Sequence, residues 1–374
     1  MYTIKKENIS LWQLFVLILI FVIGTTVVVG AGEEAKQDFW VAELIATAIG
    51  MAMAWGYYYL LRSSNGKNLY EIIVETCGRI IGNILIFGYV IYFFYIVTRN
   101  IRDFGEMMKV TILPITPIEV ISITMMFVIV FIVIQGVEVL ARVTELFTPF
   151  LVFFLLLVFF LIFASEQIHF ENLQPFLAEG FKPIFSSVFP LRSSFPYGEI
   201  VVFTVLMRSV TRFNYVGKVS VVSIMVGGLL ITFSQVIQIT TLGEDVKNRT
   251  LFPLLSASRE ISVMGFFERV DILVVFILML GILIKVSILF YAGLRGLESI
   301  FNMSYRYFII PISMCIPLFS IVNADNIIEH FEEGLQIVPY VLHLPFQMGI
   351  PILLLVLVLI RNRKNKKVAG GVKH

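Results

Sequence analysis

Long apolar runs, separated by short polar segments, follow one another along almost the whole chain. A helix needs about 20 apolar residues to cross the hydrocarbon layer of a membrane. By this criterion we predict ten transmembrane helices, which are Leu11–Val29, Trp40–Leu61, Ile80–Val97, Ile118–Gln135, Val137–Phe163, Phe185–Met207, Val216–Leu242, Asp271–Leu294, Tyr307–Ile321 and Val338–Ile360. The chain is therefore expected to form a single transmembrane domain over residues 1–374. Residues 1–10 would precede the helices, which occupy residues 11–360, and a basic tail would follow at residues 361–374.

The composition supports an all-α integral membrane protein. Hydrophobic residues make up 58% of the chain and charged residues 14%, and the mean hydropathy is +0.92. Soluble domains have about 45–50% apolar and about 25% charged residues. The apolar surface of this chain exceeds what a water-soluble core could bury.

The distribution of Lys and Arg predicts the orientation, because cytoplasmic loops of membrane proteins are enriched in these residues. Basic residues precede the first run, gather in alternate loops and dominate the tail, whereas acidic residues collect in the other loops. Both termini are therefore expected in the cytoplasm. The exceptions are basic residues on the predicted outer side: Arg99, Arg102 and Lys109 after the third run, and Lys247, Arg249, Arg259 and Arg269 after the seventh.

Two of the apolar runs are interrupted, at matching places in the two halves of the chain. The first run is interrupted at residues 23–26 (Ile-Gly-Thr-Thr), and the sixth at residues 192–199 (Arg-Ser-Ser-Phe-Pro-Tyr-Gly-Glu). In lipid, irregular backbone is tolerated only where it lines a protein cavity. Such a pair of interrupted spans indicates the binding site of an inverted-repeat transporter. The alternative is a glycine kink in one helix and a proline kink in the other.

Because an odd number of crossings separates the starts of these two runs, the two halves have opposite orientations. The predicted fold is therefore a five-plus-five inverted repeat of the LeuT-like type, with helices 1 and 6 broken. Half-helix N-termini favour anions, and freed carbonyl groups favour cations. An amino acid zwitterion carries one group of each kind. The predicted ligand-binding residues at the two breaks are Gly24, Thr25, Thr26, Phe195, Pro196, Tyr197, Gly198 and Glu199.

Lys285 lies near the middle of the eighth run. A charge at that depth is costly and marks a functional site by default. Its ammonium group would either take the place of a metal cation of a related transporter or pair with a carboxylate such as Glu199. A purely structural ion pair is the alternative.

Several further residues carry weaker signals. Arg142 and Glu145 lie three residues apart near the inner end of the fifth run, and such a pair forms a structural bridge or an inner gate. Tyr89, Tyr92 and Tyr95 approach helical spacing in the third run, where such residues pack or anchor the helix at the membrane interface; the alternative is that one of them caps a ligand. Glu43, early in the second run, is assigned no role.

Motifs of the kinds GxxxxGK[ST], HExxH, CxxC and GxSxG do not stand in contexts that support catalysis. We therefore expect no enzymatic activity, no cofactor, no metal site and no nucleic-acid partner.

The chain resembles the spore germination permeases, which are the B subunits of bacterial germinant receptors and a branch of the amino acid/polyamine/organocation superfamily. The order and spacing of several motifs along the whole chain carry the resemblance. These motifs are Gln13…Ile23-Gly24, Thr98-Arg99…Glu106-Met107…Pro117, Gly136…Arg142…Leu146-Phe147…Pro149, Asn172-Leu173…Pro175…Gly180…Pro183, Phe195…Gly198-Glu199 and Phe267-Glu268-Arg269…Asp271, followed by the basic tail.

The resemblance implies a ten-helix fold with helices 1 and 6 unwound at a ligand pocket. Residues 24–26, 195–199, Tyr92 and Lys285 fall on the pocket positions of the family. It further implies a nutrient sensor in the inner membrane of the dormant spore, working with a membrane-bound A subunit and a lipoprotein C subunit. Some relatives have a small hydroxyl residue in place of Lys285, and Thr25 replaces a small Ala or Ser. A working amino acid transporter of the same superfamily is the alternative function.

Overall fold

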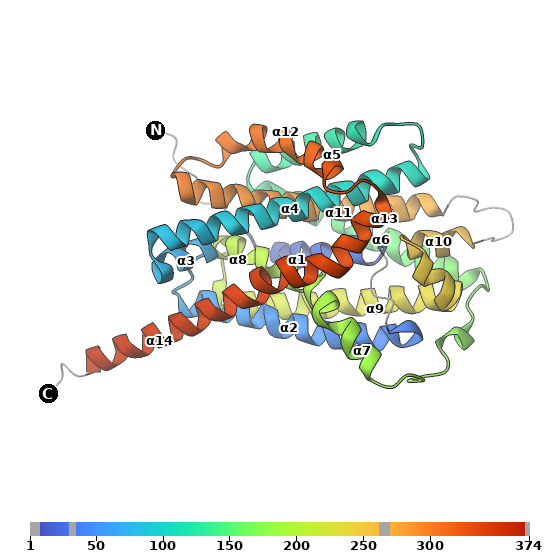
Figure 1. Ribbon diagram of the computed structural model, residues 1–374, viewed down its shortest axis with the longest axis horizontal. Coiled ribbons are helices and arrows are strands. Elements are labelled where there is room, and N and C mark those ends of the chain that lie inside the picture. Colours follow the sequence, from blue (N-terminus) through green and yellow to red (C-terminus); the bar gives the residue numbers. More distant parts are fainter. Residues whose placement is uncertain (1–7, 30–34, 262–269, 371–374) are drawn as a thin grey trace.

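The protein is a bundle of helices whose long axes run in roughly the same direction (Figure 1). The structure is a computed structural model that describes residues 8–29, 35–261 and 270–370, with side chains up to residue 365. Within these residues the only extended pairing is an isolated bridge between Ile9 and Val210. The predicted all-α membrane fold is confirmed.

Fourteen α-helices are found in the described residues. The first half contains α1 (Leu11–Thr26), α2 (Phe39–Ser63), α3 (Leu69–Cys77), α4 (Arg79–Thr111), α5 (Ile118–Ile134) and α6 (Val137–Ala164). The second half contains α7 (Lys182–Ser187), α8 (Phe203–Leu206), α9 (Val216–Arg249), α10 (Pro253–Arg259), α11 (Asp271–Phe301), α12 (Arg306–Val322), α13 (Ile327–Glu332) and α14 (Ile350–Gly370). Wide π-helical turns at Glu333–Ile337 and Pro339–Gly349 lead from α13 into α14.

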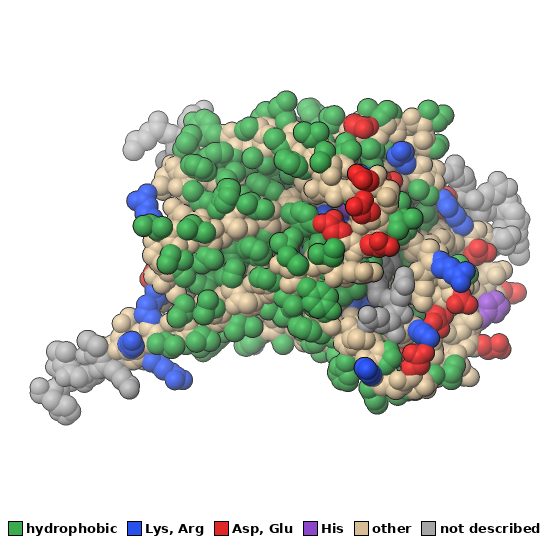
Figure 2. Space-filling model, viewed as in Figure 1, with side chains coloured by type: hydrophobic (Ala, Val, Ile, Leu, Met, Phe, Trp, Pro, Cys, Tyr) green, Lys and Arg blue, Asp and Glu red, His purple; other side chains and the backbone are tan. Residues whose placement is uncertain are grey.

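Six helical segments in the described part of the chain are long and apolar enough to cross a membrane on their own: those of α2, α4, α6, α9 and α11, and the π-helical segment that continues into α14. The shorter apolar helices α1 and α5 accompany them, and α12 bends by 106° into the segment that begins with α13. Hydrophobic side chains cover the middle of the molecule, whereas acidic side chains gather toward the end away from the tip of α14 (Figure 2). This distribution is that of a multi-pass membrane protein.

The predicted interruption of the first span at residues 23–26 is not found there. Helix α1 starts at a capping box formed by Ser10 and Gln13, and it continues without a break through Thr26. Gly24 serves close packing instead of unwinding: a Cβ atom built on it would lie 2.6 Å from the Cα atom of Gly281 in α11. Two glycines therefore let the backbones of α1 and α11 meet, as small residues do in membrane helix pairs.

The interruption of the sixth span is confirmed. Helix α7 leads into a π-helical segment, Val188–Arg192, in which Phe189 has extended backbone angles (φ −121°, ψ 129°). After residues 193–197 the chain continues as a 3₁₀-helix at Gly198–Val202 and only then as α8. Pro190 and Pro196 lack the N–H group that a regular α-helix would use, which explains why this span cannot be one continuous helix.

The structure also explains two of the exceptions to the charge rule, Arg99 and Arg102. Helix α4 extends well beyond the predicted Val97, so Arg99 and Arg102 are buried helical residues and not loop residues. Arg99 pairs with Glu333 (3.1 Å), and Arg102 pairs with Glu106 (2.8 Å). Because these cations are neutralised inside the fold, they carry no information about orientation.

At the end of the bundle from which α14 extends, ion pairs link α3 to the turn after α2, to the end of the sixth span and to α14. Its Glu75 pairs with Lys67 (2.8 Å) and Arg361 (3.6 Å), and its Glu71 pairs with Arg208. The hydrogen bond from Lys67 and the charge of Arg361 lower the pKa of the Glu75 carboxyl group. The basic segment predicted as a tail continues as helix to Gly370 and extends past the other helices (Figure 1).

Candidate ligand site at the sixth-span break

A buried ion pair joins three helical segments in the centre of the protein. The Nζ atom of Lys285 in α11 lies 2.6 Å from Oε2 of Glu199, and the two side chains are 0% and 3% exposed. Lys285 Nζ also donates a hydrogen bond to the hydroxyl of Thr25 in α1 (3.3 Å). The predicted residues Thr25, Glu199 and Lys285 therefore meet at one point, between the first, sixth and eighth spans.

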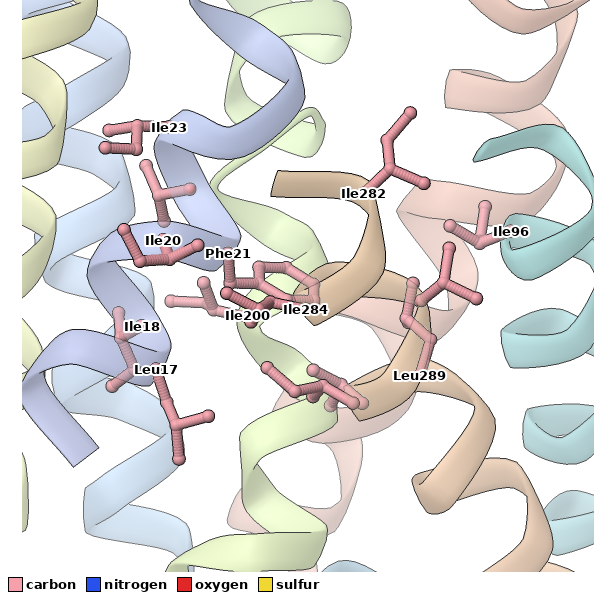
Figure 3. Close-up of a cluster of buried hydrophobic side chains, with 14 of the residues drawn as sticks. Leu17, Ile18, Ile20, Phe21, Ile23, Ile96, Ile200, Ile282, Ile284 and Leu289 are labelled. Carbon is pink, nitrogen blue, oxygen red and sulfur yellow. The ribbon is translucent and has the colours of Figure 1, made fainter. Parts of the chain in front are cut away.

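Aromatic and aliphatic side chains enclose this ion pair. Lys285 Nζ lies 4.5 Å from the ring centre of Phe195 and 5.3 Å from that of Phe21. Phe21, Ile200 and Ile284 converge from three segments (Figure 3). Such surroundings exclude water, so the attraction between the two charges is weakly screened. Each charge in turn depends on the other, because an unpaired ion is costly to bury.

A second buried ion pair lies at the start of the same break, and the sequence analysis did not find it. Arg192 donates to Glu43 of α2 at 2.7 Å, and both side chains are buried. Tyr197 also donates to Glu43 (2.6 Å), and its hydroxyl lies 2.8 Å from that of Thr47. The signal available in the sequence was that Glu43 in the second apolar run and Arg192 in the sixth carry opposite charges, and that neither had been assigned a partner.

The tenth span contributes polar groups beside Gly198. Gln347 donates to the hydroxyl of Tyr92 (2.7 Å), and that hydroxyl lies 2.9 Å from Nδ1 of His343. Tyr57 donates to the backbone carbonyl of Gln347 (2.6 Å). Tyr92 is therefore buried in a hydrogen-bonded network between the third and tenth spans, and this network borders the sixth-span break.

Gly198→Ala is expected to disturb this network while leaving the fold in place. A Cβ atom at position 198 would collide with the side-chain amide of Gln347, which can rotate away but would lose its bond to Tyr92. Loss of one buried hydrogen bond costs about 1–3 kcal/mol. Melting temperatures of Gly198→Ala, Gln347→Ala and the double variant measure this effect. Because Gln347→Ala already removes both the colliding amide and its bond to Tyr92, adding Gly198→Ala to it should cause little further loss. A further loss as large as that in the unmodified chain would show that the assigned collision is wrong.

The pair predicted between Arg142 and Glu145 is not formed. Arg142 pairs with Glu138, one turn earlier in α6, at 2.6 Å, whereas Glu145 accepts a hydrogen bond from Gln13 of α1 at 3.1 Å. The reason is the direction of the side chains: Arg142 points outward and is 68% exposed, but Glu145 faces the neighbouring helix. The contact of Glu145 thus links the first span to the fifth.

Arg142→Met should consequently have almost no effect. Exposed ion pairs contribute about 0–1 kcal/mol, so stability and ligand response are expected to match the unmodified protein. Thermal unfolding and the dissociation constant of a bound solute would check this. A loss of response at normal stability would restore the gate interpretation that the structure does not support.

The arrangement of these helices defines the class of protein: it is a membrane protein with the LeuT-type transporter fold. MhsT, whose crystal structure was solved in complex with L-phenylalanine, matches with a TM-score of 0.67, covering 95% of this chain and 89% of its own. Mhp1, a nucleobase-cation-symport-1 family transporter solved in a closed conformation with bromovinylhydantoin bound, matches with a TM-score of 0.68, covering 88% and 75%. Both are 12% identical to this chain, so they show the fold alone.

The family follows from sequence. The family model described as "Spore germination protein" matches residues 8–327. Spore germination protein KB of Bacillus subtilis is 33% identical over 369 residues, which cover 98% of both chains. The putative spore germination protein YfkT of the same organism is 28% identical over 71% of this chain and 72% of its own. The protein belongs to the spore germination permease family. One motif of the predicted resemblance, at residues 267–269, lies outside the described residues.

Proposed function

We propose that this protein is the membrane-embedded, nutrient-binding subunit of a spore germinant receptor. The observation that carries the proposal is the Lys285–Glu199 ion pair, which joins the broken sixth span to α11 and, through Thr25, to α1. Membership of the family supports the receptor role. The transporter-like fold supports binding of a small solute at the same depth.

The nutrient that fits this site best is an amino acid. A zwitterion carries a carboxylate for Lys285 and an ammonium group for Glu199, so it can exchange partners with the internal ion pair without leaving a buried charge unpaired. Residues 24–26, Tyr92 and 195–199 would surround it. This exchange of partners removes the direct link between the sixth span and α11. The ligand would then shift the equilibrium between the linked and unlinked conformations, to the extent that it binds one of them more tightly than the other.

The proposal includes two partner proteins and a location. The bound state would be communicated to the A subunit and the lipoprotein C subunit in the inner membrane of the spore. Both termini would lie in the cytoplasm, in agreement with the basic side chains near the tip of α14 (Figure 2). The described residues of α14 extend from the bundle at this end, where a cytoplasmic partner could reach them.

Binding and uptake assays on the purified full chain test the proposal. In proteoliposomes, a panel of labelled amino acids should show saturable binding of at least one member without accumulation. Saturable uptake by the chain alone would instead support the alternative function, a working amino acid transporter, which the transporter neighbours favour. If no amino acid binds, an amino acid ligand is excluded.

A further inference from the structure

Three buried oxygen atoms near the C-terminal end of α1 have no hydrogen-bond partner among the described residues. They are the hydroxyl oxygen of Thr26 and the amide oxygens of Gln235 and Gln238 in α9. The three residues are 4%, 1% and 1% exposed. Buried acceptors without partners are rare in proteins and require an explanation, such as an ion or ligand that satisfies them.

Hydrogen bonds between the end of α1 and α9 bring Val27, the residue after Thr26, against Ser234 and Gln238. The backbone carbonyl of Val27 accepts hydrogen bonds from Ser234 (3.1 Å) and from the amide nitrogen of Gln238 (3.0 Å). Gln238 also donates to Ser234 (2.9 Å). Its donors are thereby directed to Val27 and Ser234, which leaves its amide oxygen available. Gln235 follows Ser234 directly in the sequence, and Thr26 precedes Val27.

The electrostatics of this junction favour a positive charge. Helix α1 ends at Thr26, and the C-terminal end of a helix carries a partial negative charge. The unpartnered atoms are all acceptors on neutral side chains, as in sites that replace the hydration shell of a monovalent ion. Divalent ions are usually held by carboxylates, and no group of three or more His, Cys, Asp and Glu side chains suited to a metal occurs among the described residues.

We propose that Thr26, Gln235 and Gln238 form a second site, which binds a small monovalent cationic group. The group is either a free alkali ion or an ammonium group of a bound solute. This site is separate from the Lys285–Glu199 pair, which uses the neighbouring Thr25 and already carries its own ammonium group. It does not depend on the proposed receptor function, since a cation can bind in a sensor and in a transporter alike.

Equilibrium binding to the full chain in nanodiscs tests this proposal, with labelled sodium, rubidium and methylammonium as probes and choline chloride to hold the ionic strength. At least one probe should bind saturably. Thr26→Val and Gln235→Met should weaken its binding at least about tenfold, a loss of about 1.4 kcal/mol. Gln235→Glu keeps an oxygen and adds a negative charge, so it should strengthen binding. Gln135→Met, on the exposed end of α5, is the control and should change nothing.

The identity of the strongest probe distinguishes the two sources of positive charge. Binding of sodium or rubidium supports a free ion, and binding of methylammonium alone supports an ammonium group of a solute. Absence of saturable binding for all three probes would overturn the proposal. The proposal would also be overturned if Thr26→Val and Gln235→Met remained monodisperse by size-exclusion chromatography and bound the probe with unchanged affinity. Weaker binding in Gln235→Glu would overturn it as well. None of these outcomes depends on whether a nutrient amino acid binds.

Discussion

Lys285→Met is expected to lower the free energy of unfolding by about 3–5 kcal/mol, because removal of one partner leaves a buried charge uncompensated. The remaining partner, Glu199, is 3% exposed and cannot recover its hydration without opening the bundle. The variant keeps the length of the side chain and so creates little empty space. Unfolding of the purified protein in mixed detergent micelles, followed as a function of denaturing detergent, measures the change.

The double variant Lys285→Met/Glu199→Gln shows how much of the stability lost in Lys285→Met comes from the uncompensated charge and how much from altered packing. It removes both charges and should recover most of the lost stability, since neutral groups replace a pair whose desolvation is costly. The two substitutions are in contact and should therefore be strongly non-additive. Equal stability of the single and double variants would mean that the ion pair does not exist in the folded protein.

Gly24→Ala is expected to cost at least about 3 kcal/mol, the upper part of the range for overpacked cores. The new methyl group would lie 2.6 Å from the Cα atom and 3.0 Å from the carbonyl carbon of Gly281. These are backbone atoms, so no side chain can rotate away and α1 must separate from α11. Gly281→Ala meets the backbone of Gly24 in the same way and should have a similar effect.

Gly56→Ala is the matched control for this substitution. Gly56 lies inside α2, and a Cβ atom there meets nothing within 4 Å. Alanine is favoured over glycine inside a helix by about 0.5–1 kcal/mol, so this variant should be slightly more stable. Melting temperatures of the three variants in one detergent give the comparison. A Gly24→Ala protein as stable as Gly56→Ala would show that α1 and α11 do not meet at these glycines.

The parts of the fold that depend on local sequence could be predicted. Apolar runs of sufficient length predicted the helices, and the interruption at residues 192–199, with Pro196 and Gly198, predicted the break of the sixth span, because a missing N–H group acts locally. The depth of Lys285 in its run predicted a buried functional charge, and Glu199 was one of the partners considered. The structure brings these two residues together.

The parts that depend on the packing of distant segments could not be predicted. Glycine permits both a bend and a close helix contact, and only the position of Gly281 shows that Gly24 serves the second. Arg142 and Glu145 have suitable spacing for a pair, but rotation about their helix gives them different partners. Glu43 and Arg192 are 149 residues apart, so the sequence does not reveal that they meet.

The central claim is tested most directly by the binding of an amino acid that the purified chain binds saturably, together with two analogues that each carry a single charge. The Lys285→Met/Glu199→Gln variant lacks both proposed charged contacts, each worth about 1.5–3 kcal/mol, so the zwitterion should bind to it about 100-fold or more weakly than to the unmodified chain. The amino acid amide and the N-acetylated amino acid each carry only one of the two charges. Between the unmodified chain and the variant, the affinity of each analogue should therefore fall by a smaller factor than the affinity of the zwitterion. Equal dissociation constants of the zwitterion for the variant and the unmodified chain would contradict the account.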